Sequence, residues 1–401
     1  MICKRCGDLL DIVAIQPLIF KDAKKPTEGD GSKEKPYQIS NINELIYFMG
    51  VVNGKLEGIA KDSTSCAIMM NDIDVSTICG RNVGNWIPIG SLENRYSGTL
   101  NGQGYNIINL YSQKYSDYLG FFGNCYYGEI MNLGLENDTI RGKYHVGGIC
   151  GFPCKTPITN CHNTGYISGK DYCGGIAGES ESPISLCYNT GQIYSDDKAG
   201  GITGQNNSSV TNCYNTGNIG GYEAGGITGQ NEGKVNYCHS IGKYSGILGG
   251  EITGNSIGSH DSCYYIGEEA LWSSWHGVTN KTEKQYKSGE VCYLLNAGQT
   301  EAVWHQTIGV DSIPTFNPQS KIVKYDSARK KYYNVTTNSI DDIKSHNVVI
   351  YVMNRTITIS DEYNFRIFDT TGHDVTNQNG NLSYGIYLVS TKEFSKKVVV
   401  K

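Results

Sequence analysis

Five cysteines are the side chains whose type and spacing most directly suggest chemistry. They follow one another at steps of 26, 26, 25 and 25 residues and are Cys161, Cys187, Cys213, Cys238 and Cys263. A column of thiols can ligate a metal or form disulfides, because neighbouring strands lie within the Cα distance that a disulfide spans. Stacked side chains point the same way, however, and five thiols cannot all pair. We therefore interpret the column as buried free thiols that pack as small hydrophobic groups, and we assign no metal and no cofactor.

Carboxylates are the second group with catalytic potential. Asp72 and Asp74 lie two residues apart, which places both on one face of a strand, and Asp196 and Asp197 are adjacent. Calcium takes six to eight oxygen ligands, and two carboxylates are too few. We therefore interpret Asp72 and Asp74 as solvated or turn-capping residues. His305 has neither a partner base nor a nucleophile motif, and no H-E-x-x-H motif occurs, so we assign no catalytic residue.

Tyrosines form a third group, with 29 in 401 residues. On stacked structural units, exposed tyrosines offer a flat aromatic face for a glycan or a protein. The candidate ligand face consists of Tyr166, Tyr188, Tyr194, Tyr214 and Tyr222. The alternative interpretation is that most of these rings pack in the core or in turns.

A sequence repeat must position all these side chains. Gly-Gly-Ile recurs in phase with Cys-x-Asn-Thr-Gly, and the latter motif contains Asn163, Asn189 and Asn215. A fixed short period indicates one structural unit stacked on copies of itself. Each period contains three short strand-like pieces separated by turn residues, which favours a solenoid. We predict an all-β fold, with a right-handed parallel β-helix followed by a small antiparallel β-sandwich.

Two expectations concern the corners of the coils. We expect the repeated glycines to turn the backbone with positive φ, which glycine adopts without steric cost. We expect the three asparagines to stack at one turn, where they form an amide ladder and tolerate the left-handed conformation. Roughly nine coils at a spacing of ~4.8 Å give a solenoid about 43 Å long.

The repeat resembles a known family. Gly-Gly-Ile-x-Gly followed by x-Ile-x-x-Cys-Tyr-Asn-Thr-Gly is similar to the GLUG repeat, over residues 119–267. The resemblance implies a bacterial cell-surface β-helix, as in the non-catalytic amino-terminal parts of IgA-specific metallopeptidases. It implies no catalytic activity.

The flanking segments differ from the repeat. Residues 1–28 form an amino-terminal segment that we interpret as the remnant of a longer start, because Asp11 interrupts an apolar run. Residues 29–118 begin the β-helix. Within them, Asn41-Ile-Asn-Glu44 predicts a capping box and a short amphipathic helix that seals the open end. Residues 268–320 are predicted to cap the other end.

Residues 321–401 are predicted to form the β-sandwich. The order Phe-Arg-Ile-Phe-Asp-Thr-Thr-Gly372, Gly385-Ile-Tyr-Leu-Val and Lys-Lys-Val-Val-Val-Lys401 resembles the carboxy-terminal sorting domain of type IX secretion cargo. The resemblance implies that the type IX secretion machinery recognises residues 321–401. The protein would then be secreted or held on the outer-membrane surface of a Gram-negative bacterium.

Composition narrows the function. Only 38% of residues are hydrophobic and no stretch is long enough for a membrane-spanning helix. The net charge is −5, and the chain has no basic run interleaved with aromatics, so we expect no nucleic-acid partner. We expect a monomer that acts as an adhesin or spacer and binds a glycan or protein. The alternative is a polysaccharide lyase or hydrolase that uses Asp72, Asp74, Asp196 and Asp197; it requires two carboxylates about 5–10 Å apart in a groove.

Overall fold

The computed structural model describes residues 20–267, 275–335, 350–353, 356–359, 365–383, 385–390 and 395–400. Its contacts divide the chain into two units, Met1–Ser320 and Lys321–Lys401, and each unit is described by itself. The first unit is a parallel β-helix and the second consists of antiparallel sheets, so the predicted fold class is confirmed.

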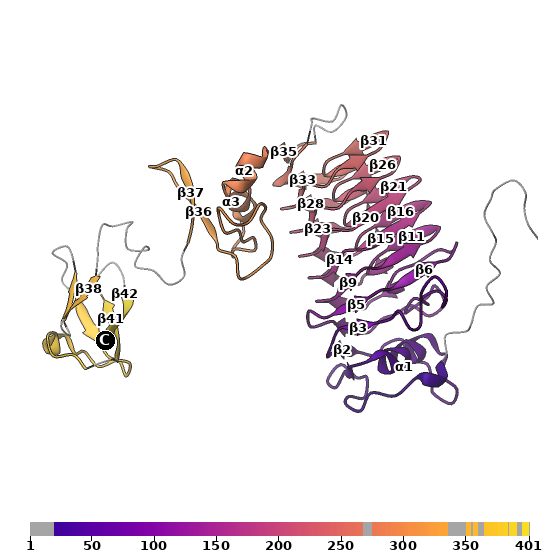
Figure 1. Cartoon of the computed structure of the whole chain (residues 1–401), viewed down its shortest axis with the longest axis horizontal. Helices are drawn as coiled ribbons and strands as arrows, with labels where there is room; N and C mark the ends of the chain where they lie inside the picture. The colour runs from indigo at the N-terminus through magenta and orange to yellow at the C-terminus, as the bar shows by residue number, and fades with distance from the viewer. Residues whose placement is uncertain are drawn as a thin grey trace, which may run out of the picture. The chain divides into compact units, whose positions relative to one another are not determined.

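Five parallel sheets run along the described part of the solenoid, and each complete coil contributes one strand to each of them (Figure 1). Sheet 1 contains β1 (Tyr37–Ile39), β2 (Ala67–Met69), β4 (Thr99–Asn101), β8 (Glu129–Met131), β13 (Ile158–Thr159), β18 (Ile184–Ser185), β23 (Ser209–Thr211), β28 (Lys234–Asn236) and β33 (Ser259–Asp261). Sheet 2 contains β3 (Ile73–Asp74), β5 (Asn106–Ile108), β9 (Gly134–Glu136), β14 (His162–Asn163), β19 (Tyr188–Asn189), β24 (Tyr214–Asn215), β29 (His239–Ser240), β34 (Cys263–Tyr265) and β35 (Val278–Asn280).

The other three sheets are shorter. Sheet 3 contains β6 (Tyr111–Gln113), β10 (Thr139–Arg141), β15 (Tyr166–Gly169), β20 (Gln192–Ser195), β25 (Ile219–Gly220) and β30 (Tyr244–Ser245). Sheet 4 contains β11 (Tyr144–Gly147), β16 (Asp171–Gly174), β21 (Lys198–Gly200), β26 (Glu223–Gly225) and β31 (Leu248–Gly250). Sheet 5 contains β7 (Phe122–Tyr126), β12 (Cys150–Cys154), β17 (Ala177–Ser180), β22 (Thr203–Asn206), β27 (Thr228–Asn231) and β32 (Thr253–Ser256).

Each coil has five strands where the sequence predicts three, and a left-handed residue explains part of the difference. Leu186 has a φ of 56° and separates β18 from β19. In the sequence, these residues look like one strand, because apolar and polar side chains alternate along them. Its equivalents in other coils are also left-handed and are Asn132, Asn160, Asn212, Tyr237 and Ser262. Because the left-handed residue turns the chain, Ile184 and Cys187 both point into the core although they are three residues apart.

The repeated glycines do not have the predicted positive φ. Gly174, Gly175 and their equivalents lie outside the left-handed region. A Cβ atom on Gly175 would lie 2.4 Å from the carbonyl oxygen of Gly201 on the next coil. The prediction of glycine-driven corners is therefore wrong at these positions, because close approach of successive coils is what excludes a side chain.

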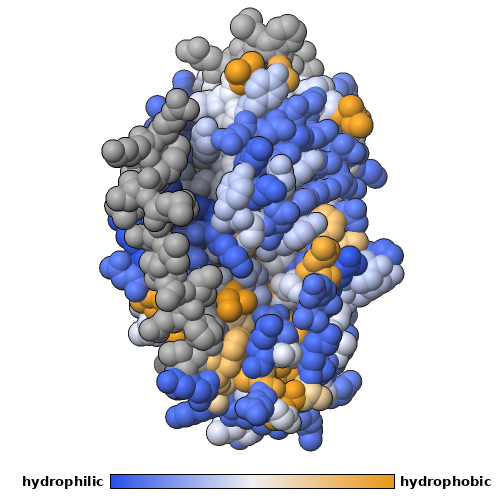
Figure 2. Space-filling model, turned by 90° about the vertical axis from the view of Figure 1, so that its right-hand side faces the viewer, coloured by the Kyte–Doolittle hydropathy of each residue, from blue (hydrophilic) through white to orange (hydrophobic). Residues whose placement is uncertain are grey.

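A single hydrophobic core fills the solenoid, and the sheets alternate between inward and outward residues. In β20, for example, Ile193 and Ser195 are buried and Gln192 and Tyr194 are exposed. The outer surface is correspondingly polar. Figure 2 looks onto the side that carries β11 to β31 in Figure 1 and shows hydrophilic residues over most of its upper half.

The amino-terminal end carries a helix, as the sequence predicts. The short helix η1 (Phe20–Asp22) precedes α1 (Ile42–Asn53), which lies at this end of the solenoid (Figure 1). Asn41 caps α1, because its side chain accepts hydrogen bonds from the backbone N–H groups of Asn43 and Glu44. The Glu44 carboxylate accepts from the backbone N–H of Ser40 rather than of Asn41, so the reciprocal half of the predicted capping box is shifted by one residue.

The segment after the repeats differs from the predicted end cap. Residues 268–274 lie outside the described residues, and β35 then extends sheet 2 beyond β34. The helices α2 (Glu283–Lys287) and α3 (Glu290–Asn296) and residues 297–317 fold back along the outer side of sheet 2. Gln299 exchanges hydrogen bonds with Asn212, and the Trp304 ring lies 5.1 Å from that of His239. Aromatic side chains on sheet 2 provide an apolar surface for this segment. Among the described residues of the segment, β35 is the part that extends the end of the solenoid.

The second unit forms antiparallel sheets around its own core. Its strands are β36 (Val323–Asp326), β37 (Lys331–Asn334), β38 (Ile350–Met353), β39 (Thr356–Ile359), β40 (Arg366–Phe368), β41 (Gly385–Ser390) and β42 (Ser395–Val400), with a short helix η3 (Thr376–Gln378). β36 pairs with β37, β38 with β39, and β41 with both β40 and β42. Ile357 of β39 packs with Ile367 and Val389 of the three-stranded sheet.

Candidate functional site

A column of stacked rings runs along the outer face of sheet 2. The His162 and Tyr188 rings are 4.8 Å apart and 4° from parallel, and the Tyr188 and Tyr214 rings are 4.9 Å apart at 5°. His239 follows at 5.3 Å. The parallel register places these residues at the same position of successive coils. We call these four residues the ring ladder.

The ring ladder begins at His162 because the preceding coil has a glycine at that position. Gly134 of β9 pairs with His162 of β14. A Cβ atom on Gly134 would lie 2.3 Å from Cε1 of His162. The missing side chain leaves room for the His162 imidazole, and Gly134 itself lines the cavity described below.

The segment after α3 covers the other half of the ladder. Phe316 and Trp304 lie 5.3 and 6.1 Å from the Tyr214 ring, between centroids. His239 donates a hydrogen bond through Nε2 to the carbonyl oxygen of Pro314 at 3.0 Å. Burial lowers the pKa of His239 to about 3, so its ring is neutral. Tyr214 is only 7% exposed beneath this cover.

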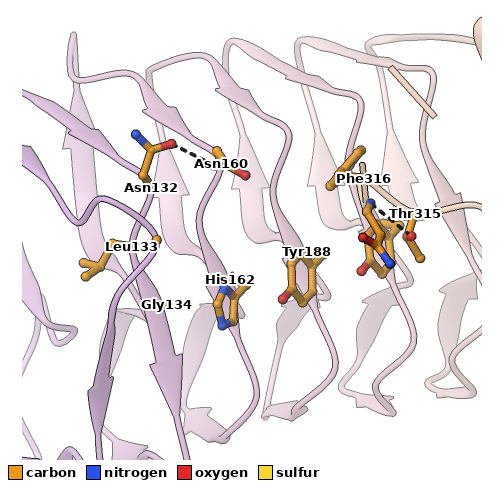
Figure 3. A pocket seen from close by; sticks show the side chains of 11 residues that line it. Asn132, Leu133, Gly134, Asn160, His162, Tyr188, Thr315 and Phe316 are labelled. Atoms are coloured by element: carbon orange, nitrogen blue, oxygen red, sulfur yellow. Dashed lines mark hydrogen bonds between the residues drawn. The ribbon is translucent and has the colours of Figure 1, made fainter. Parts of the chain in front are cut away.

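A cavity of about 320 Å³ remains between the uncovered rings and residues 315–317. Figure 3 shows its labelled residues: Asn132, Leu133, Gly134, Asn160, His162, Tyr188, Thr315 and Phe316. Gly104, Tyr214 and Asn317 complete the lining, which contains no Asp, Glu, Lys or Arg. Burial lowers the pKa of His162, which keeps its imidazole uncharged at neutral pH. The cavity is therefore uncharged, and its lining combines polar and apolar groups.

Amide groups form one wall of the cavity. Asn160 donates a hydrogen bond to the Asn132 side chain at 2.7 Å, and Asn132 donates to Asn101 at 2.9 Å. The row ends at Asn160, because the next coil has Leu186 at this position. The Asn160 amide oxygen is exposed and has no hydrogen-bond partner among the described residues. It is available to accept a hydrogen bond from a ligand.

The predicted asparagine ladder lies inside the solenoid beneath this site. Asn163 donates to Asn189 and Asn189 donates to Asn215, each at 2.8 Å. All three are fully buried strand residues without positive φ. The expectation that they occupy a left-handed turn is therefore wrong, because the left-handed residues come three positions earlier.

The five ladder cysteines are buried, and their thiols are free. The backbone N–H of Cys161 points at Sγ of Cys187 at 3.4 Å, and the same contact joins Cys213 and Cys238. Burial raises the pKa of the Cys161, Cys187 and Cys238 thiols well above the usual value. The column is part of the core and does not reach the cavity.

The five candidate tyrosines do not share one face. Tyr188 and Tyr214 belong to sheet 2, Tyr166 and Tyr194 to sheet 3, and Tyr222 follows β25. On sheet 2 the rings stack face to face, so neither face of the Tyr188 ring is open. The prediction of a single flat aromatic surface is wrong, because the coil separates these residues onto different sheets.

The candidate acids also lie apart. Asp74 caps a turn, because it accepts a hydrogen bond from the backbone N–H of Ser76. Asp72 instead accepts from the backbone N–H of Asn106 on the next coil. Asp197 lies between β20 of sheet 3 and β21 of sheet 4 and pairs with Lys198 at 2.9 Å. In the part of the chain that the structure describes, no group of three or more His, Cys, Asp and Glu could hold a metal ion.

His305 has a positioning role. Its backbone N–H and C=O pair with Thr315 at 2.9 and 3.0 Å, which fixes the strand that faces the ring ladder. Sequence reasoning missed Asn160, His162 and residues 315–317 as parts of one site. The available signal was His162 itself, which stands where the next two repeats have tyrosine.

Comparisons with known proteins support the fold. No family model matches the sequence. A stretch of 174 residues, 41% of this chain, is 28% identical to halomucin of Haloquadratum walsbyi and covers 2% of it. A stretch of 114 residues, 28% of the chain, is 32% identical to a protein of Evansella cellulosilytica provisionally described as a Gly-rich membrane protein and covers 12% of it. The chain thus spans a small fraction of either relative.

A solved structure from Bacteroides ovatus, provisionally described as an immunoglobulin A1 protease, has a TM-score of 0.55 with 23% identity. The match covers 73% of this chain and 95% of that one, and it shows a common fold. Among the described residues, no helix has the length and apolar character needed to cross a membrane.

Proposed function

We propose that this chain is a glycan-binding module and that the cavity on sheet 2 holds a neutral sugar residue. The observation that carries the proposal is the lining, which combines polar and apolar groups and has no charged side chain. An ion or a strongly acidic ligand would find no counter-charge there. A sugar needs hydrogen-bond donors and acceptors at fixed positions together with some apolar contact.

The groups around the cavity meet that need. The Asn160 amide oxygen can accept a hydrogen bond, and the Tyr188 hydroxyl can donate one and accept one. One nitrogen of the neutral His162 imidazole is a hydrogen-bond donor and the other is an acceptor. The Phe316 ring adds an apolar surface. A volume of about 320 Å³ is within the range of small-molecule pockets. His162 and Tyr188 lie on strands of sheet 2, so little ordering of these two side chains is needed on binding.

We further propose that the protein acts as an adhesin of a secreted or surface-anchored kind. The likeness of residues 119–267 to GLUG repeats and of residues 321–401 to type IX sorting domains supports this proposal. In it, the type IX secretion machinery binds the second unit, and the solenoid presents the cavity at the outer-membrane surface of a Gram-negative bacterium. The alternative of a polysaccharide-cleaving enzyme has no supporting observation, because the candidate acids are not assembled in the described residues.

Binding of neutral oligosaccharides tests the proposal. The purified chain is applied to an array of neutral and acidic glycans, and the best neutral ligand is titrated by calorimetry. Tyr188→Phe keeps the ring stack but removes the hydroxyl, and we expect binding to weaken roughly tenfold. Asn160→Ala should also weaken binding of the neutral glycan. Tyr222→Phe, an exposed tyrosine away from the cavity, is the matched control and should bind normally.

The opposite result would be equally clear. Absence of binding to every neutral glycan, or equal affinity of the Tyr188→Phe and unaltered chains, would reject this cavity as the sugar site.

A further inference from the structure

A second cavity, of about 540 Å³, lies at the edge of sheet 3, where the chain turns toward sheet 4. It is more open than the first and is charged. Its walls include Arg141, Tyr166, Ser168, Lys170, Tyr194 and Asp196. None of these residues takes part in the site on sheet 2.

Three successive coils build this cavity in register. Arg141 of β10 pairs with Ser168 of β15, and Ser168 pairs with Tyr194 of β20. The next partner of Tyr194 is Gly220. Because Tyr194 stands between two small residues, it has no stacked ring on either side and is 49% exposed. Tyr194 therefore offers the flat aromatic face that the ring ladder on sheet 2 does not.

Two cations face this cavity without a counter-ion. Arg141 and Lys170 are exposed and form no salt bridge among the described residues. The Arg141 guanidinium lies 5.0 Å from the centre of the Tyr166 ring, which holds it over that ring. Lys143 lies nearby on the same turn and contacts the Tyr144 ring at 4.7 Å. Asp196 is the single acid in the lining.

We propose that this cavity binds an acidic sugar residue of a polysaccharide. Its carboxylate or sulfate group would contact Arg141 and Lys170, and its ring would lie against Tyr194. Guanidinium groups bind planar and tetrahedral anions through two parallel hydrogen bonds. Neighbouring coils are about 4.8 Å apart, so the cations and the tyrosine form a short row that suits an extended chain.

A densely charged polyanion such as nucleic acid fits less well. The lining holds two cations and one acid, and the chain carries a net charge of −5. Nucleic-acid sites normally neutralise many phosphates with a continuous basic surface. An aromatic face beside a few cations is the more selective arrangement for a sugar ring that carries one anionic group.

The test measures binding of two acidic probes to the full chain by calorimetry. Oligogalacturonate carries carboxylates and a heparin oligosaccharide carries mainly sulfates, so the two arms distinguish the anionic group. The double variant Arg141→Gln with Lys170→Gln should bind the preferred probe roughly ten- to a hundredfold more weakly, since two charge-assisted hydrogen bonds are lost. Asp196→Asn should bind it more tightly. Lys234→Gln, at an exposed lysine of sheet 1, is the control for loss of a positive charge away from the cavity.

Three outcomes would overturn the inference. They are failure of both probes to bind, unchanged affinity in the double variant, and equal affinity for a DNA duplex of the same length. Circular dichroism verifies that each variant is folded. Neutral glycans are measured in parallel, and because the two cavities share no residue, failure of the sheet 2 site would leave this result standing.

Discussion

At the scale of single residues, the buried carboxyl group of Asp138 sets the direction of the asparagine ladder. Asp138 lies at the amino-terminal end of the ladder, and the amide atom of Asn163 that faces it is 2.9 and 3.1 Å from its two oxygens. With Asp138 protonated, that atom is the amide oxygen and it accepts a hydrogen bond from the carboxyl group. With Asp138 ionised, the amide must turn over to donate, and the rest of the row must follow.

Burial favours the protonated form. Desolvation raises the pKa of Asp138 from 3.8 to about 7, against hydrogen bonds from the backbone that lower it. The folded state therefore holds a proton that the unfolded chain releases near pH 4. The protonated Asp138 carboxyl group therefore stabilises the folded state fully below about pH 4, and this stabilisation is lost as the pH rises to about 7. The shift corresponds to at most about 4 kcal/mol.

Replacing Asp138 with asparagine tests this linkage. The introduced amide would stay neutral and continue the amide row at every pH. We expect Asp138→Asn to raise the urea midpoint at pH 8, where the unaltered chain must bury a charge, and to change it little at pH 4. Asp117→Asn, at an exposed aspartate, serves as control. A stabilisation that is the same at both pH values would show that Asp138 does not titrate in this range.

At the scale of the element, the boundary between sheets 1 and 2 depends on a left-handed residue in every coil from Asn132 to Ser262. Three of these positions hold asparagine, which tolerates the conformation, whereas Leu186 does so at a steric cost. A β-branched residue would be still less favourable there. The corner is therefore a site at which backbone conformation, rather than packing, limits the choice of residue.

The comparison of two substitutions at Leu186 isolates this effect. We expect Leu186→Val to be less stable than Leu186→Asn by about 1–2 kcal/mol, measured by urea denaturation of the whole chain. At Ser185, in the adjoining strand β18, the valine variant should be at least as stable as the asparagine variant, because strands favour β-branched residues. The same order of stability at both positions would mean that side-chain polarity, and not φ, decides.

The elements also show how far sequence alone reaches. The period predicted the parallel solenoid, and the common phase of the cysteines and asparagines predicted which residues stack. The corner at Leu186 escaped prediction because leucine is not a turn residue. The site on sheet 2 escaped because its second wall, Thr315–Asn317, comes from a segment without a repeat that lies more than 100 residues beyond Tyr188. Periodicity describes contacts between coils but not contacts with such a segment.

At the scale of the whole molecule, the two units have separate cores. The core of the first runs from Tyr37 to Tyr265 and that of the second from Ile357 to Val400, and the two share no residue. Each unit thus buries its own apolar side chains. The solenoid does not need the second unit for its core, which agrees with the proposed role of the second unit in export alone.

Deletion of residues 321–401 tests that division of roles. We expect the shortened chain to keep its β-sheet circular dichroism and its neutral-glycan binding, because both reside in the first unit. Expressed behind a Sec signal in a bacterium with type IX secretion, it should fail to reach the cell surface, whereas the full chain should reach it. Equal amounts at the surface would reject the export role of residues 321–401.

The placement of the sheet 2 cavity has an evolutionary consequence. Gly134 lines one end of the cavity, and the segment that covers Tyr214 closes the other. Its length is thus a whole number of coils. Duplication of one repeat between these two points would lengthen it by a single rung of about 4.8 Å without disturbing either end. Unequal recombination between repeats would therefore give the lineage a stepwise means of changing the length of the proposed sugar site.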